Sequence, residues 1–222
     1  LGGRLDELDM LLQVMQSLPG ALGREMQDTG RATPPCGFRP IQFVDVMPRT
    51  SDRRVDLVSF TGSTAAGRLV GAACGAALKR VSLELGGKSA AVVLDDADPE
   101  AVAEGIKVAG LMNSGQACVA QARVLVPASR HDEYVDALAT MVAEAPVGDP
   151  DDPATEVGPL VARRPQGRVR DYIELGAKEG ARLVVGGTEQ PAGLDRGWYV
   201  RPTLFADADN TMRIAREEVF GP

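Results

Sequence analysis

The sequence has few aromatic residues, a single histidine and no long uninterrupted apolar run. Aromatic residues make up 4% of the 222 residues, whereas hydrophobic residues as a whole make up 44%. The core of the folded chain must therefore be mainly aliphatic. No apolar stretch approaches the roughly 20 residues that a bilayer-spanning helix requires, and the sequence shows no basic-then-apolar secretory start. We therefore predict a cytoplasmic protein with no membrane partner.

Cysteine and basic charge are also scarce. The three cysteines, Cys36, Cys74 and Cys118, are an odd number without metal-type spacing, which argues against a disulfide framework and against a zinc site. We predict no metal site. The formal net charge is −7, and a chain this acidic without a basic cluster is a poor candidate for binding nucleic acid or anionic lipid.

From Val55 onward, short β-rich runs alternate with helical patterns. Strands are expected at 55–60, 79–85, 90–96 and 123–127, and helices at 64–79, 99–113 and 131–145. A helix followed by a strand is expected over 163–187, and an extended segment over 198–207. This alternation predicts an α/β fold with a largely parallel sheet.

Residues 1–54 have a different character. Leucines and Met15 recur at helical spacing until Pro19 and Gly20 end the run, which predicts one helix. Residues 31–54 are rich in proline and arginine without a sustained period, which is typical of an irregular segment. We hypothesise that this segment is translated out of frame or joined from elsewhere. The chain begins with Leu1 and ends on Gly221–Pro222, so we also expect both ends to be cut.

The stretch FTGST at 60–64 joins a predicted strand to a predicted helix. Gly62 would let backbone N–H groups approach a ligand, and the helix N-terminus that follows Ser63 favours an anion such as a pyrophosphate. The alternative is an ordinary turn with a helix N-cap. The stretch is not a GxGxxG motif, so the usual dinucleotide fingerprint is absent.

The stretch VSLELGGKSA at 81–90 places Glu84 between Leu83 and Leu85 in a strand that we expect to be buried. A carboxylate in such surroundings is a usable general base. The alternative is an outward-pointing Glu84 on an edge strand. Lys88 is either its charge partner or a solvated loop lysine, and the second is favoured.

The stretch NSGQACVA at 113–120 contains Cys118 beside small residues that would let a substrate reach the sulfur. An accessible thiolate is a nucleophile, whereas a buried free cysteine is ordinary packing. A dyad with His131 is an alternative, but the sequence around His131 is typical of a solvated helix start. Cys74 lies within an alanine-rich helix pattern and is predicted to be packing.

Taken together, FTGST, LELGGK and GQAC, with 34 residues from Glu84 to Cys118, resemble the NAD(P)-dependent aldehyde dehydrogenase superfamily. The terminal EEVFGP, residues 217–222, resembles the cofactor-side motif of that family. The resemblance runs from about Val55 to the last residue. It implies an aldehyde dehydrogenase-like, partial α/β fold. Residues 55–85 would complete a Rossmann-type dinucleotide-binding domain, 86–222 would form most of the catalytic domain, and 1–54 are unassigned.

The resemblance also implies a reaction. Cys118 would attack an aldehyde carbonyl to give a thiohemiacetal, its backbone N–H would donate to the oxyanion, and hydride transfer would leave a thioester. Glu84 would activate the water that hydrolyses the thioester. By the same resemblance, the residues that bind the cofactor are Gly62, Ser63, Glu218 and Phe220.

The partners implied are a small aldehyde and NAD or NADP, with NAD favoured, and the family analogy implies a homo-oligomer. Two alternatives remain open. In the first, the chain is an inactive aldehyde dehydrogenase fragment or an assembly partner without catalysis. In the second, it is a cofactor-independent thiol esterase that uses Cys118 and Glu84. The sequence does not indicate which aldehyde is oxidised.

Overall fold

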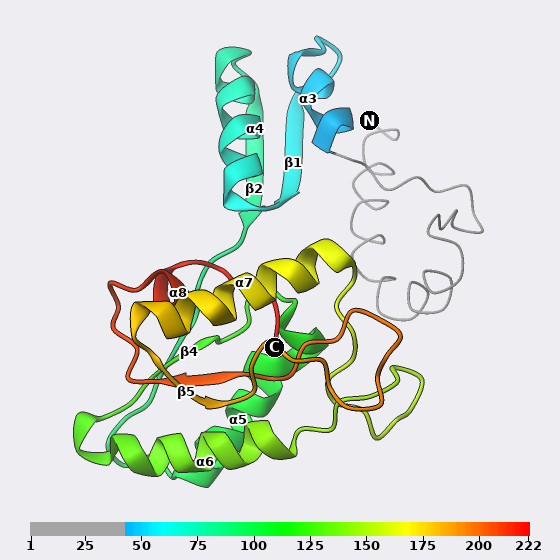
Figure 1. The fold of residues 1–222 in the computed structure, drawn as a ribbon. Coiled ribbons are helices and arrows are strands. Elements are labelled where there is room, and N and C mark those ends of the chain that lie inside the picture. The colour runs from blue at the N-terminus through cyan, green and yellow to red at the C-terminus, as the bar shows by residue number, and fades with distance from the viewer. Residues whose placement is uncertain (1–42) are drawn as a thin grey trace. The chain divides into compact units, whose positions relative to one another are not determined.

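The structure of the chain is a computed structural model that describes residues 43–222 (Figure 1). The helix predicted near the start of the chain, and Cys36, lie outside the described residues. Within residues 43–222, no helix is both long enough and apolar enough to cross a membrane.

Every strand and helix predicted from Val55 onward is present, although three of the strands are shorter than expected. The α-helices are α3 Phe43–Ser51, α4 Thr64–Ala76, α5 Pro99–Leu111, α6 His131–Glu144, α7 Arg163–Glu179 and α8 Arg213–Arg216. The strands are β1 Leu57–Gly62, β2 Arg80–Leu85, β3 Ala90–Val92, β4 Arg123–Leu125, β5 Arg182–Val185 and β6 Leu204–Ala206. Short 3₁₀ turns, η2 Met112–Gly115 and η3 Ala128–Arg130, follow α5 and precede α6.

Helix α3 corrects the prediction that residues 31–54 are irregular throughout. Val46 and Met47 of this helix pack against an apolar cluster formed by Val58, Val70 and Cys74. Pro48 lies inside the helix and removes one backbone donor, a cost that the packing of the apolar side offsets. The sequence rule that equates proline with a loop therefore failed here, because tertiary packing outweighed it.

The sheet prediction is confirmed only in part. The described strands form three two-stranded sheets: β1 with β2 and β3 with β4 are parallel, whereas β5 with β6 is antiparallel. The predicted alternation gave the correct order of elements. It could not give the strand pairs, because pairing depends on contacts between segments far apart in the sequence.

The β1–α4–β2 unit is a parallel pair with a crossover helix (Figure 1). Helix α4 buries Gly67, Val70 and Cys74 along one side. A Cβ on Gly67 would overlap the side chain of Leu85 on β2, so a larger residue there would displace Leu85. The buried position of Cys74 confirms that this cysteine is packing material.

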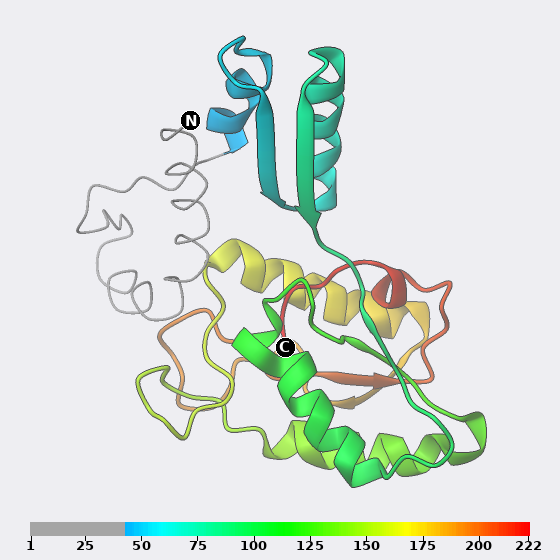
Figure 2. The same ribbon diagram turned by 180° about the vertical axis from the view of Figure 1, so that it is seen from behind.

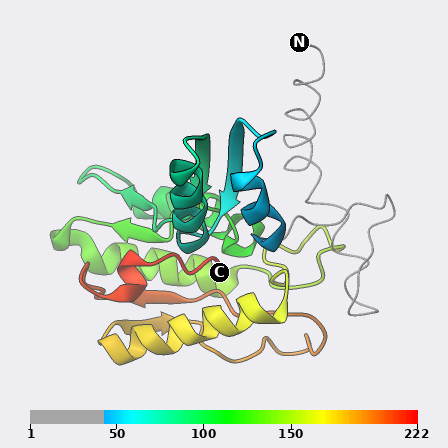
Figure 3. The same ribbon diagram turned by 90° about the horizontal axis from the view of Figure 1, so that it is seen from above.

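Residues 86–222 are organised around two groups of helices. Helices α5 and α6 pack against each other, as Figure 2 shows. Helix α7 packs beside β5 and against α8 (Figure 3). The apolar face of α7 supplies Val169 and Ile173 to a cluster completed by Leu160 and Val200. Helix α7 ends at Gly180, which caps it in the left-handed conformation.

Candidate active site

Cys118 lies in the loop between α5 and β4, and the loop backbone just before it is unusual. Asn113, Ser114 and Gly115 have φ angles of 50°, 57° and 69°, so three consecutive residues adopt the left-handed conformation. This conformation costs roughly 1–2 kcal/mol for each residue that is not glycine. A loop of this kind persists only where the surrounding structure holds it.

Side chains within the loop supply that support. Ser114, which is 5% exposed, donates from Oγ to the carbonyl oxygen of Gly158 at 3.0 Å. Gln116 donates from Nε2 to the carbonyl oxygen of Asn113 at 3.1 Å. The N–H of Val161 donates to Oε1 of Gln116 at 3.0 Å. The segment 158–161 therefore fixes the loop from outside.

The thiol of Cys118 is exposed. Among the described residues, no hydrogen bond occupies the backbone N–H of Cys118. An exposed sulfur with a free N–H beside it can add to a carbonyl group and donate to the oxyanion that forms.

The terminal segment 217–222 is anchored at Glu217. Tyr172 of α7 donates from its hydroxyl to Glu217 Oε2 at 2.6 Å, and Arg213 of α8 donates from Nε to Glu217 Oε1 at 2.9 Å. The hydrogen bonds from Arg213 and then Tyr172 lower the pKa of Glu217 to about 2. They therefore hold this carboxylate in its charged form.

The next residue, Glu218, has a different environment. Its carbonyl oxygen accepts a hydrogen bond from the guanidinium group of Arg168. Its Oε1 atom is buried and has no hydrogen-bond partner among the described residues. A buried carboxylate oxygen without a partner is costly, and a ligand hydroxyl group would satisfy it. Phe220, which is 36% exposed, has a φ of 62°.

Two glycines show that the predicted motifs meet in space. A Cβ on Gly115 would overlap the backbone carbonyl of Gly221, and a Cβ on Gly86 would overlap the Glu218 carboxylate. Segment 217–222 therefore lies against both the loop that carries Cys118 and the Gly–Gly turn that follows β2. The structure brings together GQAC, LELGGK and EEVFGP, which are far apart in the sequence.

Glu84 lies on β2, opposite Thr61 of β1 in the strand register. The expectation that it is buried was wrong, because Glu84 is exposed. Strand β2 pairs with β1 alone among the described strands, so it is an edge strand. No hydrogen bond or ion pair within residues 43–222 joins Glu84 to Cys118.

Gly62 and Ser63 lie where β1 ends and α4 begins. Ser63 is the N-cap of α4, and its side chain accepts a hydrogen bond from the N–H of Ala66 at 3.3 Å. A Cβ on Gly62 would lie 2.6 Å from the ring of Phe60, so a side chain at this position would require the ring to move. The N-cap alternative is therefore correct, and it is compatible with an anion at the same helix end.

The structure corrects the reading of Lys88 and leaves His131 outside the thiol site. Lys88 is not a solvated loop lysine, because its burial and then the charge of Arg123 lower its pKa to about 8. His131 begins α6 and lies 3.1 Å from Asp132 and 3.5 Å from Asp207. Among the described residues, none of its hydrogen bonds or ion pairs involves Cys118.

Sequence reasoning missed four residues that hold the site in place. They are Ser114 and Gln116 in the thiol loop and Arg168 and Tyr172 on α7. The polar side chains of NSGQ were the available signal for the first two. No local signal marks the α7 residues, since their partners lie 45 and 50 residues away.

The described residues fit a dinucleotide at two points. The exposed N-terminal turn of α4, with Ser63 at its cap, suits a phosphate. The unpartnered Oε1 of Glu218 suits a sugar hydroxyl group. Within residues 43–222, no group of three or more His, Cys, Asp and Glu residues could hold a metal ion.

Comparison with known proteins identifies relatives over most of the chain. The model of the aldehyde dehydrogenase family matches residues 46–222. Geranial dehydrogenase of Castellaniella defragrans is 54% identical over 168 residues, which are 76% of this chain and 34% of that protein. The 3-succinoylsemialdehyde-pyridine dehydrogenase of a Pseudomonas species is 47% identical over 79% of this chain and 37% of its own length.

Solved structures give the same result. Aldehyde dehydrogenase C of Pseudomonas syringae, a mutant in complex with NAD+ and octanal, is 40% identical with a TM-score of 0.77. The match covers 79% of this chain and 36% of the Pseudomonas syringae chain. An aldehyde dehydrogenase of Mycobacterium tuberculosis in complex with NAD+ is 50% identical with a TM-score of 0.75, over 78% and 36% of the two chains. The chain thus spans about a third of the length of these relatives.

The family match starts somewhat earlier than the resemblance expected from about Val55. It begins at residue 46, inside α3, so residues 46–54 belong with the matched segment. This finding contradicts the hypothesis of an out-of-frame or foreign origin for that part of 31–54. The predicted division of 55–222 at residue 85 stays a prediction.

Proposed function

Because the chain belongs to the aldehyde dehydrogenase family, we propose that it oxidises an aldehyde to a carboxylic acid with Cys118 as the nucleophile. One observation carries the proposal. Segment 217–222 lies against Gly115, three residues before Cys118, and also against Gly86, two residues after Glu84. The thiol loop and the turn after the proposed general base thus both lie against the cofactor-side segment 217–222.

Cys118 begins the proposed reaction. Its thiolate adds to the aldehyde carbon, and its free backbone N–H donates to the oxygen of the resulting thiohemiacetal. The hydride leaves this carbon, which produces a thioester on Cys118. Glu84 takes a proton from the water molecule that hydrolyses the thioester, and the carboxylic acid departs with the thiol restored.

NAD(P), when bound, supplies the hydride acceptor. We propose that Ser63 and Gly62 lie at its phosphates, Glu218 at the ribose next to the nicotinamide, and Phe220 beside the ring. The α4 N-terminus and the unpartnered Glu218 oxygen support this placement. NAD is favoured over NADP, since two similar structures contain NAD+.

We propose an aliphatic aldehyde as the substrate class. A relative 54% identical over its matched residues is a geranial dehydrogenase, and a similar structure contains octanal. Octanal and geranial are therefore the first substrates to test. The cytoplasmic location and the homo-oligomer stay predictions.

A second candidate function is hydrolysis of activated esters without a cofactor. The observation that favours it is that the loop of Cys118, its supporting residues and the segment 217–222 all lie within residues 86–222. The loop of Cys118 and its supports therefore lie outside the β1–α4–β2 unit, and Glu84 on β2 is the one residue of the proposed esterase site within that unit. Ester turnover that is unchanged by NAD and lost in Cys118→Ala would distinguish this function from aldehyde oxidation.

The proposed function is tested by NADH absorbance after addition of NAD and octanal to the purified chain. Cys118→Ala is expected to reduce the rate by at least about 10³-fold, as loss of a covalent nucleophile does. Cys74→Ala is the matched control, because Cys74 is buried in the β1–α4–β2 unit, and it should keep the rate. Equal rates in the two variants, or no NADH from the folded chain, would contradict the proposal.

A further inference from the structure

The loop that carries Cys118 is closed on itself by reciprocal hydrogen bonds between Asn113 and Gln116. Nδ2 of Asn113 donates to the carbonyl oxygen of Gln116 at 3.1 Å. The N–H and Nε2 of Gln116 both donate to the carbonyl oxygen of Asn113, at 3.1 Å each. The three left-handed residues 113–115 lie within this closed turn. These bonds fix the shape of the turn, but its orientation must be held by contacts outside the loop.

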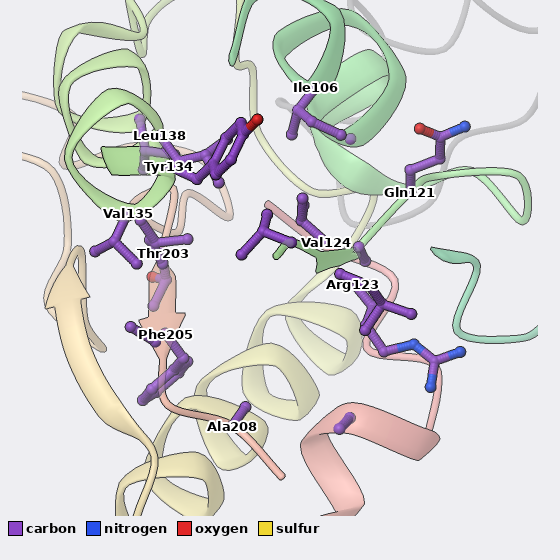
Figure 4. Close-up of a pocket in the computed structure, with 18 of the residues that line it drawn as sticks. Ile106, Gln121, Arg123, Val124, Tyr134, Val135, Leu138, Thr203, Phe205 and Ala208 are labelled. Atoms are coloured by element: carbon purple, nitrogen blue, oxygen red, sulfur yellow. The ribbon is translucent and has the colours of Figure 1, made fainter. Parts of the chain in front are cut away.

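The far end of the loop is fixed to α5 and β4. The N–H of Ala120 donates to the carbonyl oxygen of Ala117 at 3.0 Å, which closes a second turn around Cys118. The N–H of Gln121 donates to the carbonyl oxygen of Ala109 in α5 at 3.0 Å, and the chain then enters β4, as Figure 4 shows. Cys118 therefore lies between two anchored ends, and the direction of its N–H depends on both.

Segment 146–161 holds the near end of the loop through two hydrogen bonds. Ser114 is buried and has a φ of 57°, and its Oγ donates to the carbonyl oxygen of Gly158 at 3.0 Å. Oε1 of Gln116 accepts a hydrogen bond from the N–H of Val161 at 3.0 Å. Within residues 43–222, no other hydrogen bond joins residues 112–118 to residues 146–161. The two side chains are therefore the hydrogen-bonded connection between the loop and this segment.

Segment 146–161 is itself held from several sides. The N–H of Gly148 donates to the carbonyl oxygen of Val157 at 3.1 Å, and the side chain of Val157 is fully buried. The hydroxyl group of Tyr199 donates to the carbonyl oxygen of Gly148 at 3.1 Å. Glu156 forms an ion pair with Lys107 of α5 at 2.7 Å. A segment that is fixed in this way can hold a strained loop in one conformation.

We propose that Ser114 and Gln116 are positioning residues for Cys118: through them, segment 146–161 holds the loop so that the backbone N–H of Cys118 faces the oxyanion that forms when the sulfur adds to a carbonyl group. This inference rests on the proposed role of Cys118 as the nucleophile. Left-handed backbone is unfavourable for residues other than glycine, so the loop should relax when either bond is lost. A relaxed loop still exposes the sulfur, but it no longer aligns the N–H as an oxyanion donor.

Two reactions of the same sulfur separate this alignment from thiol reactivity. The thiolate attacks the carbonyl carbon of p-nitrophenyl acetate through an oxyanion, p-nitrophenolate leaves, and the acetyl group remains on the sulfur. The thiolate also attacks the methylene carbon of iodoacetamide, and iodide leaves without formation of an oxyanion. Both reactions require the thiolate, so the ratio of the acylation rate to the alkylation rate cancels the thiolate fraction and reports the oxyanion donor.

Both rates are measured on the complete 222-residue chain without NAD. Absorbance of p-nitrophenolate follows acylation, with Cys118→Ala as the background, and mass spectrometry of the Cys118 peptide follows alkylation. We expect Ser114→Ala and Gln116→Met each to lower the acylation-to-alkylation ratio by about tenfold, since misalignment of an oxyanion donor should cost part of the ~10²–10³-fold that its removal costs. The alkylation rate alone should change by less than about twofold, because the thiol stays exposed.

Thr140→Ala is the matched control. Thr140 donates from Oγ1 to the carbonyl oxygen of Asp136 at 3.0 Å within α6, so this variant also loses a bond from a hydroxyl group to a carbonyl group, and it should keep the ratio. Circular dichroism verifies that each variant is folded. The two loop variants are independent, so misfolding of one leaves the other as the test.

The outcomes separate the two claims. If the ratio for Cys118 in the original chain is no higher than the ratio for glutathione, the nucleophile role and the proposed function are contradicted together. If the ratio in the original chain is higher but stays unchanged in the folded loop variants, or falls equally in Thr140→Ala, the positioning role alone is overturned. A merely structural role of Ser114 and Gln116 would change acylation and alkylation alike and leave the ratio constant.

Discussion

Gly115 has a positive φ angle, and a Cβ at this position would overlap the carbonyl group of Gly221. A side chain at this position would strain the backbone and push the segment 217–222 away from the thiol loop. We expect Gly115→Ala to lower the free energy of unfolding by about 2–3 kcal/mol, as measured by urea denaturation. It should also change the rate at which iodoacetamide modifies Cys118.

Gly105→Ala is the matched control for this substitution. Gly105 lies inside α5, and nothing lies within 4 Å of a Cβ built there. Alanine is the better helix former, so this variant should be more stable by about 0.5–1 kcal/mol. Equal destabilisation of both alanine variants would contradict the claim that the positive φ angle of Gly115 and its close approach to Gly221 require glycine.

Lys88 gives a second prediction for a single residue. Its pKa is lower in the folded chain than in the unfolded chain, so folding favours the neutral amine. The stability of the chain should therefore rise as the pH increases from about 8 to about 10.5. At pH 7, Lys88→Met should raise the free energy of unfolding by about 3 kcal/mol, and this advantage should disappear toward pH 10.5.

Lys178→Met provides the comparison for Lys88. Lys178 is exposed and forms an ion pair with Glu174 within α7, so its replacement should change stability little. An effect of Lys88→Met on the free energy of unfolding that does not vary between pH 8 and 10.5 would contradict a lowered pKa of Lys88 in the folded chain.

Residue chemistry was only partly predictable from the sequence. The motif around Cys118 indicated an exposed thiol, and the alanine-rich pattern indicated that Cys74 is buried, as the structure has it. The surroundings of Glu84 and Lys88 were predicted wrongly. Exposure of a strand residue depends on which strands pair beside it, and burial of a loop lysine depends on segments distant in sequence.

At the scale of elements, the segment 217–222 depends on α7 and α8 for its position. Tyr172 and Arg213 hold the Glu217 carboxylate, while Val219 packs against the α7 cluster. The hydrogen bonds from Arg213 and Tyr172 lower the pKa of Glu217 to about 2. Their stabilising effect is present above the ordinary carboxyl pKa near 4.5 and is lost as the pH falls toward 2.

Glu217→Gln tests this anchor. We expect the variant to unfold at a lower urea concentration than the original chain at pH 7, because it loses the charged hydrogen bonds. The difference should shrink between pH 5 and pH 2. A difference that stays constant over this range would contradict the role of the charged carboxylate.

Element order was the most predictable feature of the fold, and strand pairing was the least predictable. Periodicity located the strands and helices from β1 to β6, because local pattern decides them. Helix α3 was missed since Pro48 suggested a loop, and α8 is only four residues long. The three separate strand pairs were not foreseeable, because each depends on partners that the local sequence does not specify.

For the molecule as a whole, many large apolar side chains of the described residues remain exposed. Val92 on β3 is 70% exposed, and Leu69 on α4 is 56% exposed. Apolar exposure on this scale, beside free strand edges, marks surfaces that other polypeptide segments cover. The chain spans about a third of the length of its relatives, which agrees with this interpretation.

The central claim is that Cys118 carries the substrate as a thioester. The most direct measurement uses the Glu84→Gln chain, in which hydrolysis should be slowed by about 10²–10⁴-fold. The chain is incubated with NAD and octanal, digested, and analysed by mass spectrometry. We predict an octanoyl group on the peptide that contains Cys118, removable by hydroxylamine and dependent on NAD. No octanoyl group on Cys118 of the folded chain, or one on Cys74 instead, would contradict the account.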